Sequence, residues 1–207
     1  RERPPSPQGL SSDRWEASLF HALERFSALR EVTEIVLVLR RDDIAWAKSA
    51  YNAPFRRLKV SRIVAGGKRR QDSVWSGIRR CRGDVDLIAI HDAARPFTDP
   101  GLIRRVIRRA AATGAAIAAL PATDTLKEVG SGSIIVRTLD RSRLWHAQTP
   151  QIFRREIIVD AHRRVRRLGL EATDDAQIAE SAGFPVTIVR GSPNNVKITT
   201  LADLRPF

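Results

Sequence analysis

A six-residue segment, His91-Asp92-Ala93-Ala94-Arg95-Pro96, carries side chains that can do chemistry and follows an apolar run. In an open α/β sheet, ligands gather beyond the carboxyl ends of the strands. An aspartate at that place can hold Mg²⁺, which takes hard oxygen ligands. Arg95 can present a charged fork to a phosphate. A helix cap at Asp92 and a surface arginine are the other interpretation of the same residues.

A second segment, Gly66-Gly67-Lys68-Arg69-Arg70-Gln71-Asp72-Ser73, lies between an apolar run and a helical pattern. Glycines let a ligand approach the backbone, and the free N–H groups of a helix start suit an anion. The G-x-x-x-x-G-K-[ST] spacing of a Walker A loop is absent. A tight turn is therefore the competing explanation for the glycine pair.

Two further stretches hold candidate phosphate contacts. Lys197 lies in the otherwise uncharged segment Asn194–Thr199, and Arg141 and Thr149 flank Trp145. A solvated lysine and an ordinary surface ion pair of Arg141 are the alternatives. The chain contains no Gly-x-Ser-x-Gly, so a hydrolase nucleophile elbow is not supported.

The elements that must position these residues alternate between short apolar runs and amphipathic stretches. Because apolar, branched runs are typical of strands buried on both faces, the alternation predicts a mostly parallel sheet with helices on both faces. Expected strands cover 35–39, 60–64, 85–90, 115–120 and 186–189, and expected helices cover 15–29, 42–51, 72–80, 100–113, 155–168 and 174–182. We expect Asp72 or Ser73 to cap the third helix.

The stretch 123–139 departs from this alternation. Two strand-like runs enclose Gly130-Ser131-Gly132, which predicts a projecting β-hairpin arm. A lone hairpin is marginally stable, so it should pack on something, and a second subunit is a candidate.

Bulk composition narrows the function class. The 207 residues carry a formal net charge of +13 and 43% hydrophobic residues, enough for one domain with a core. The basic excess suggests anionic partners, although a solvated, arginine-rich surface is the simpler explanation. The sequence shows no nucleic-acid-binding motif and no membrane-spanning run. Cys81 is the only cysteine, which fits a cytoplasmic protein.

Taken together, several motifs resemble the 2-C-methyl-D-erythritol 4-phosphate cytidylyltransferase family of sugar-phosphate nucleotidyltransferases. The resemblance runs from about Leu19 to the end of the chain, and the order and spacing of the motifs make it specific. It rests on Gly66–Val74, His91–Pro96, Thr123–Lys127, Asp140-Arg141, Gln148–Gln151, Thr173–Ala176 and Asn195–Thr199.

The resemblance implies a fold and a reaction. It implies one Rossmann-like nucleotidyltransferase domain over residues 1–207 and a homodimer whose arms, residues 123–147, are exchanged between subunits. The implied reaction joins CTP and 2-C-methyl-D-erythritol 4-phosphate, releases pyrophosphate and uses Mg²⁺. The substrate phosphate attacks the α-phosphorus of CTP in line, so catalysis is mostly positioning and charge neutralisation.

The resemblance also implies roles for matching positions. Gly67 and Ser73 match the cytidine site, Asp92 the metal ligand and Ala93 the ribose region. The resemblance implies no role for Lys68. Matches to the methylerythritol phosphate site are Arg95, Thr125, Arg141, Thr149, Thr173 and Lys197. Matches to catalytic residues are Arg1, Arg141 and Lys197.

The front of the chain departs from the family pattern. The family opens with a buried strand, an Ala-Ala-Gly-x-Gly-x-Arg loop around the triphosphate, and Pro-Lys-Gln. Here Arg1 aligns with the arginine of that loop and Gln8 with the lysine, while the strand and the glycines are absent. We therefore expect little activity from these 207 residues. Two alternatives stay open: a ribitol-5-phosphate cytidylyltransferase, and a catalytically impaired relative that binds anions or nucleic acid.

Overall fold

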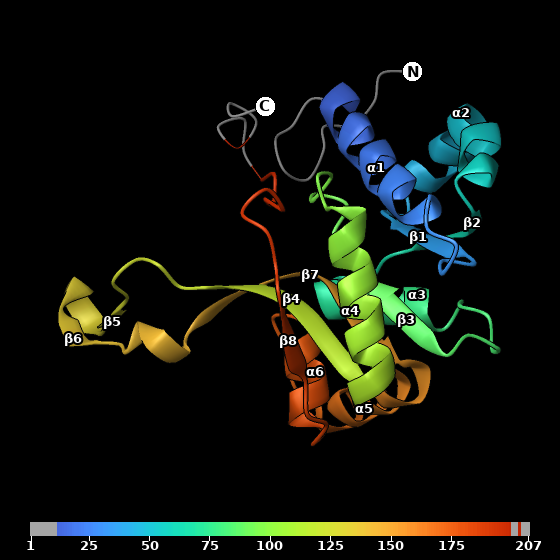
Figure 1. Ribbon diagram of the computed structural model, residues 1–207. Helices are drawn as coiled ribbons and strands as arrows, with labels where there is room; N and C mark the ends of the chain where they lie inside the picture. The colour runs from blue at the N-terminus through green and yellow to red at the C-terminus, as the bar shows by residue number, and fades with distance from the viewer. Residues whose placement is uncertain (1–11, 200–202, 204–207) are drawn as a thin grey trace.

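The computed structural model describes residues 12–199 and residue 203, and Figure 1 shows its arrangement. Within that part, strands and helices alternate through most of the chain. The elements are α1 (Ser12–Ser27), β1 (Ile35–Leu39), α2 (Asp43–Arg57), β2 (Val60–Ala65), α3 (Arg70–Ile78), β3 (Leu87–Ile90), α4 (Pro100–Thr113), β4 (Ala115–Pro121), β5 (Lys127–Val129), η1 (Ser131–Ser133), β6 (Ile135–Thr138), η2 (Arg141–Arg143), β7 (Trp145–Arg154), α5 (Arg155–Leu168), α6 (Asp175–Ser181) and β8 (Thr187–Arg190).

The strands of the body form two sheets. β1 and β2 pair in parallel, and a four-stranded sheet has the order β3-β7-β4-β8. In the larger sheet β3, β4 and β8 run in one direction, and β7 is antiparallel to its neighbours β3 and β4. The expected α/β architecture is confirmed. β7, which lies between β3 and β4, is a strand that the sequence pattern does not predict.

Alternating side chains of the larger sheet pack against helices on opposite faces. Ala116, Ala118 and Ile152 form a buried cluster with residues of α4. Their neighbours Ala115, Ile117 and Phe153 join a different cluster, which includes residues of α3, α5 and α6. This period of two is the pattern of strands buried on both faces.

A cavity of about 1070 Å³ lies between the two sheets. Its walls include the whole of β1 and β3, with side chains from α1 and α3. In the described part of the chain, β1 pairs only with β2, and β3 only with β7. Each of these strands therefore turns one unpaired edge toward the other across the cavity.

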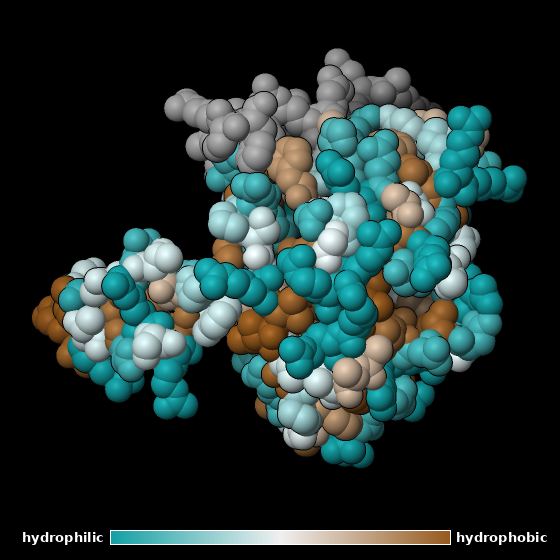
Figure 2. All heavy atoms as spheres, in the orientation of Figure 1, coloured by the Kyte–Doolittle hydropathy of each residue, from teal (hydrophilic) through white to brown (hydrophobic). Residues whose placement is uncertain are grey.

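The predicted hairpin is present as β5 and β6, which pair antiparallel around η1. It projects from the body as an arm in Figure 1. Its large apolar side chains are exposed, with Ile134 at 70% and Val136 at 62% of full exposure. Figure 2 shows apolar atoms gathered at the end of the arm.

Several expected boundaries shift. α3 begins at Arg70 rather than Asp72, and Arg69 occupies its N-cap without a capping side-chain hydrogen bond. The expected caps are thus wrong, since Asp72 lies inside the first turn. α2 runs beyond Tyr51 because the chain kinks there, which leaves Pro54 near the start of a new helical segment. Within the described residues, no helix is long and apolar enough to cross a membrane.

Candidate active site

His91 holds the segment after β3 in place through hydrogen bonds. The Nδ1 atom of His91 lies 3.0 Å from the Thr149 hydroxyl on β7, and its Nε2 atom lies 3.1 Å from the Arg95 carbonyl. The ring of Phe26 covers it at a centroid distance of 4.7 Å. Burial lowers the pKa of His91 to about 4, so the ring is neutral near neutral pH. His91 therefore supports the loop rather than supplying charge.

The strand β7 and the C-terminal segment meet this loop through Asn195. Its side chain is fully buried, donates to the Thr149 carbonyl at 2.8 Å and accepts from the Thr98 hydroxyl at 2.6 Å. The Thr149 hydroxyl in turn accepts from the Asp92 backbone N–H at 3.1 Å. Three parts of the chain that are distant in sequence are thus held together at the carboxyl end of β3.

Asp92 is placed between two cations. Its Oδ2 atom lies 3.1 Å from Lys197 Nζ, and its Oδ1 atom lies 3.5 Å from Arg70 Nη2. Burial alone raises the pKa of Asp92, but the charges of Arg70 and Lys197 outweigh burial and hold the pKa below its ordinary value. The carboxylate is therefore ionised at neutral pH and still 19% exposed, which leaves it able to meet a ligand.

Arg95 is directed at the same C-terminal segment. Its Nη1 atom donates to the Asn195 carbonyl at 2.6 Å, while its Nε atom is buried with no hydrogen-bond partner. Burial lowers the pKa of Arg95, and Asp92 opposes this effect. A buried guanidinium with an unused donor favours an additional acceptor, such as a phosphate oxygen.

The glycine loop lies beside this carboxylate. Ser73 Oγ accepts from the Gly67 N–H at 3.1 Å, so the first turn of α3 closes back onto the loop. A Cβ at Gly66 would come within 2.8 Å of Ser73 Oγ, which explains the need for glycine. The four residues expected to bind nucleotide, Gly67, Ser73, Asp92 and Ala93, all line the cavity between the sheets.

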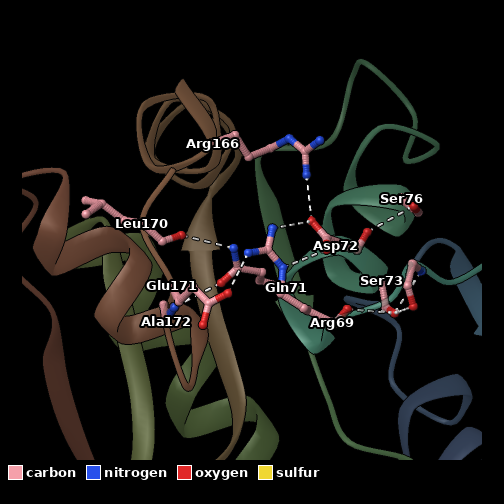
Figure 3. A network of polar contacts seen from close by, with 10 residues as sticks. Arg69, Gln71, Asp72, Ser73, Ser76, Arg166, Leu170, Glu171 and Ala172 are labelled. Atoms are coloured by element: carbon pink, nitrogen blue, oxygen red, sulfur yellow. Dashed lines mark hydrogen bonds and ion pairs between the residues drawn. The ribbon is translucent and has the colours of Figure 1, made fainter. Parts of the chain in front are cut away.

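A polar network joins α3 to the connection between α5 and α6 (Figure 3). Gln71 donates to the Leu170 carbonyl at 3.1 Å and accepts from the Ala172 N–H at 2.9 Å. Asp72 lies 2.8 Å from Arg166 Nη1. The glycine loop and the segment that leads into α6 are therefore held together as one unit.

Thr173 precedes α6 and is exposed. Its hydroxyl and backbone N–H both donate to Gln177, while the Asp174 side chain accepts from the Gln177 N–H. This reciprocal arrangement resembles a capping box. The Thr173 contacts are thus local, and its expected substrate role stays a prediction.

The expected arm residues do not join the cluster within one chain. Thr125 and Arg141 are exposed, and the Arg141 side chain donates to the Thr123 carbonyl. Both belong to the arm that projects from the body in Figure 1. Arg1 and Gln8 lie outside the described residues.

Four residues of the site were not predicted from the sequence: Arg70, Asp175, Gln151 and Asn195. Each lies within a motif described above, but its contacts are with residues far away along the sequence. Arg70 Nη2, for example, lies 2.8 Å from Asp175 Oδ2. Two local features could have indicated this pair: Arg70 lies in the glycine-containing segment, and Asp175 lies at the start of a predicted helix.

Comparisons with known proteins agree with this arrangement. The sequence model of the family described as "IspD: 2-C-methyl-D-erythritol 4-phosphate cytidylyltransferase" matches residues 14–206. A protein of that name from Syntrophus aciditrophicus is 44% identical over 186 residues, which are 90% of this chain and 80% of the relative.

Solved structures show the same likeness. The 4-diphosphocytidyl-2C-methyl-D-erythritol synthase from Anaerococcus prevotii has a TM-score of 0.81 and 28% identity, covering 90% of this chain and 82% of that one. The 2-C-methyl-D-erythritol 4-phosphate cytidylyltransferase from Thermus thermophilus has a TM-score of 0.72 and 31% identity, covering 97% and 88%. The chain belongs to the 2-C-methyl-D-erythritol 4-phosphate cytidylyltransferase family.

Proposed function

We propose that the protein transfers CMP from CTP to 2-C-methyl-D-erythritol 4-phosphate, releasing pyrophosphate, in the biosynthesis of isoprenoid precursors. The observation that carries this proposal, beside family membership, is the ionised Asp92 between Lys197 and Arg70 at the carboxyl end of β3. Such a mixed cluster suits two anionic reactants, because it offers cations to phosphates and one carboxylate to a metal.

The chemistry is an in-line displacement at phosphorus. A phosphate oxygen of the sugar alcohol forms a bond to the α-phosphorus of CTP, and the bond from that phosphorus to the pyrophosphate oxygen breaks. Lys197, which contacts Asp92, and Arg95, which follows Asp92 in the same segment, would offset the negative charge of the entering phosphate. Gly67 and Ser73 would hold the cytidine part, and Ala93 would leave room for the ribose.

The residues present fit Mg²⁺ in a particular way. Among the described residues, no group of three or more His, Cys, Asp or Glu side chains could hold a metal ion. A single carboxylate, Asp92, fits a Mg²⁺ ion that takes its other ligands from substrate phosphates and water. When bound, Mg²⁺ would offset charge on the phosphate oxygens.

The dimer is part of the same proposal. The arm, residues 123–147, exposes Ile134 and Val136 and carries Thr125 and Arg141 away from the Asp92 cluster. Exposed apolar side chains on a projecting hairpin favour burial against a partner. We infer that the arm packs on a second copy and that its Arg141 and Thr125 reach that copy's substrate phosphate.

CTP and a sugar-alcohol phosphate are the proposed ligands because of family membership. The net charge of +13 does not require nucleic acid as a partner. The expectation of a cytoplasmic protein rests on the single Cys81.

Pyrophosphate release tests the proposal directly. Because little activity is expected from these 207 residues, the protein is assayed both unmodified and with a family-like strand, glycine loop and Lys at position 8 grafted on, using CTP and Mg²⁺ plus either methylerythritol phosphate or ribitol 5-phosphate. We expect a higher kcat/KM for methylerythritol phosphate, and Asp92→Asn should weaken Mg–CTP binding while the fold stays intact. A preference for ribitol 5-phosphate would select the rival substrate. Absence of turnover, together with salt-sensitive binding to nucleic acid, would favour the catalytically impaired alternative.

Subunit mixing tests the shared site. In a full-length relative with this arm, variants equivalent to Arg141→Ala and Asp92→Asn are each assayed alone and after mixing, with subunit exchange confirmed by a mass tag. If the two residues act from different chains, some mixed dimers hold one intact site and activity returns. No recovery after confirmed exchange contradicts the shared site.

A further inference from the structure

Asp175 is a fully buried carboxylate at the first residue of α6. Its Oδ2 atom lies 2.8 Å from Arg70 Nη2, and its Oδ1 atom lies 3.6 Å from His162 Nε2. Neither carboxylate oxygen has a well-aligned hydrogen bond, so the Arg70 contact is an ion pair. The capping side chain of α6 is the neighbouring Asp174. Capping therefore does not explain why Asp175 carries a charge.

Burying a carboxylate is costly unless a partner compensates it. Here the compensating partner is Arg70, and Arg70 also lies 3.5 Å from the Asp92 carboxylate through the same Nη2 atom. One guanidinium nitrogen thus bridges a buried carboxylate and a partly exposed one. Burial lowers the pKa of Arg70, but the charges of Asp175 and Asp92 outweigh it and raise the pKa.

The Asp175 end of this bridge is fixed in place. The Gln151 side chain on β7 accepts from the backbone N–H groups of Asp175 and Ala176, each at 3.0 Å, which anchors the start of α6. The ring of His162, itself buried, stacks on Trp75 of α3 with centroids 5.5 Å apart. The Asp175 side chain is therefore held in place, and the Arg70 guanidinium has to take the position that reaches it.

The neighbours of Arg70 along α3 are held toward the same side. Figure 3 shows Arg69 and Gln71 in contact with the connection between α5 and α6, and Asp72 in contact with Arg166 of α5. Arg69 Nη1, for instance, lies 2.9 Å from Glu171 Oε1. The start of α3 is thus tied to the α5–α6 connection on several sides, and Asp175 adds the buried contact.

We propose that Asp175 is a positioning residue for nucleotide binding: it fixes the Arg70 guanidinium, which fixes the Asp92 carboxylate opposite Lys197. The assignment rests on the proposed function of Asp92. Asp175 itself is fully buried, so it would act only through Arg70. Arg70 lines the same cavity as Gly67, Ser73 and Asp92.

The test measures the affinity for Mg–CTP by titration calorimetry in a double-mutant cycle of Asp175→Asn and Arg70→Gln. Asn is isosteric with Asp and removes only the charge. We expect Asp175→Asn alone to weaken binding about 10- to 100-fold, the usual effect of removing such a supporting contact. In the Arg70→Gln background, the same change should alter affinity less than about twofold, because the path from Asp175 to Asp92 is already broken.

Glu180→Gln is the matched control, since it removes a carboxylate charge from the same helix at an exposed position. It should leave thermal stability and Mg–CTP affinity close to those of wild type. Arg70→Lys should restore only part of the affinity lost in Arg70→Gln, because lysine lacks a planar fork.

The outcomes separate the inference from the proposed function. Equal losses from Asp175→Asn in both backgrounds, or a loss of stability with unchanged affinity, would overturn the positioning role. A protein with the grafted front end that binds Mg–CTP without consuming methylerythritol phosphate would instead contradict the proposed function, and the coupling would still be measurable.

Discussion

Replacing Asn195 by alanine should destabilise the protein and loosen the substrate side of the site. The side chain is fully buried and makes three hydrogen bonds, to the Thr149 carbonyl, to Gln148 and from Thr98. Two of these partners retain other contacts, since Gln148 Oε1 accepts from the Ser192 N–H and Thr98 also donates to a carbonyl. Of the three partners, the Thr149 carbonyl is the one that would be left without a hydrogen bond.

The magnitude follows from this count. Thr149 faces the irregular register of β4 and β7 between Ile117 and Ala119, so no regular ladder bond is expected to replace the lost one. An unsatisfied buried acceptor costs about 1–3 kcal/mol, and an ordinary lost hydrogen bond about 1 kcal/mol. We expect a decrease in the free energy of unfolding of roughly 3 kcal/mol, which for a chain of this size corresponds to a Tm lower by about 6–12 °C.

Denaturant unfolding and thermal melting measure the stability, and pyrophosphate release measures KM for each substrate. The KM for the sugar-alcohol phosphate should rise more than the KM for CTP, because Asn195 positions Thr149 and Arg95. Asn194→Ala is the matched control, since Asn194 is exposed. A stability of Asn195→Ala within about 0.5 kcal/mol of wild type would refute the reasoning.

Three other predictions concern neighbouring residues. Lowering the pH from about 8 to about 5 should decrease the free energy of unfolding by about 2 kcal/mol through His91, because its pKa is 6.5 in the unfolded chain and about 4 in the folded one. The contribution of His91 to stability is fully present above pH 6.5 and is lost as the pH falls toward 4. A His91→Asn protein whose unfolding has the same pH dependence as wild type would contradict this. Lys197→Met should raise the pKa of Asp92, as read by carboxyl NMR, and an unchanged pKa would show that the pair is weak. Gly67→Ala should weaken CTP binding about tenfold or more, because the new Cβ would collide with Asp72. An unchanged affinity for CTP in titration calorimetry would contradict this expectation.

Much of the fold could be predicted because local patterns and long-range packing agree. The expected bounds of α4 and α5 match the structure, as do those of β1. β7 could not be predicted, because Gln148, Thr149 and Gln151 interrupt any apolar pattern. These polar side chains are buried, and tolerated there because distant segments supply their hydrogen bonds.

The candidate site was predicted in part for the same reason. The glycine pair and the segment around Asp92 stand out locally, since strand ends and helix starts create binding sites. The ion pair between Arg70 and Asp175 joins residues that only the folded chain brings together. No spacing rule links them, so their contact emerged only from the structure.

The unpaired edges of β1 and β3 have a consequence for how the molecule opens. β1, β2, α1 and α2 contribute to a hydrophobic cluster separate from those of the larger sheet. Because no backbone ladder connects the two sheets in the described residues, amide protons of β1 and β2 should exchange with solvent through a lower-energy local opening. The glycine loop follows β2, whereas Asp92 follows β3. A nucleotide that contacts both would therefore slow hydrogen exchange throughout β1 and β2, including at amides that it does not touch.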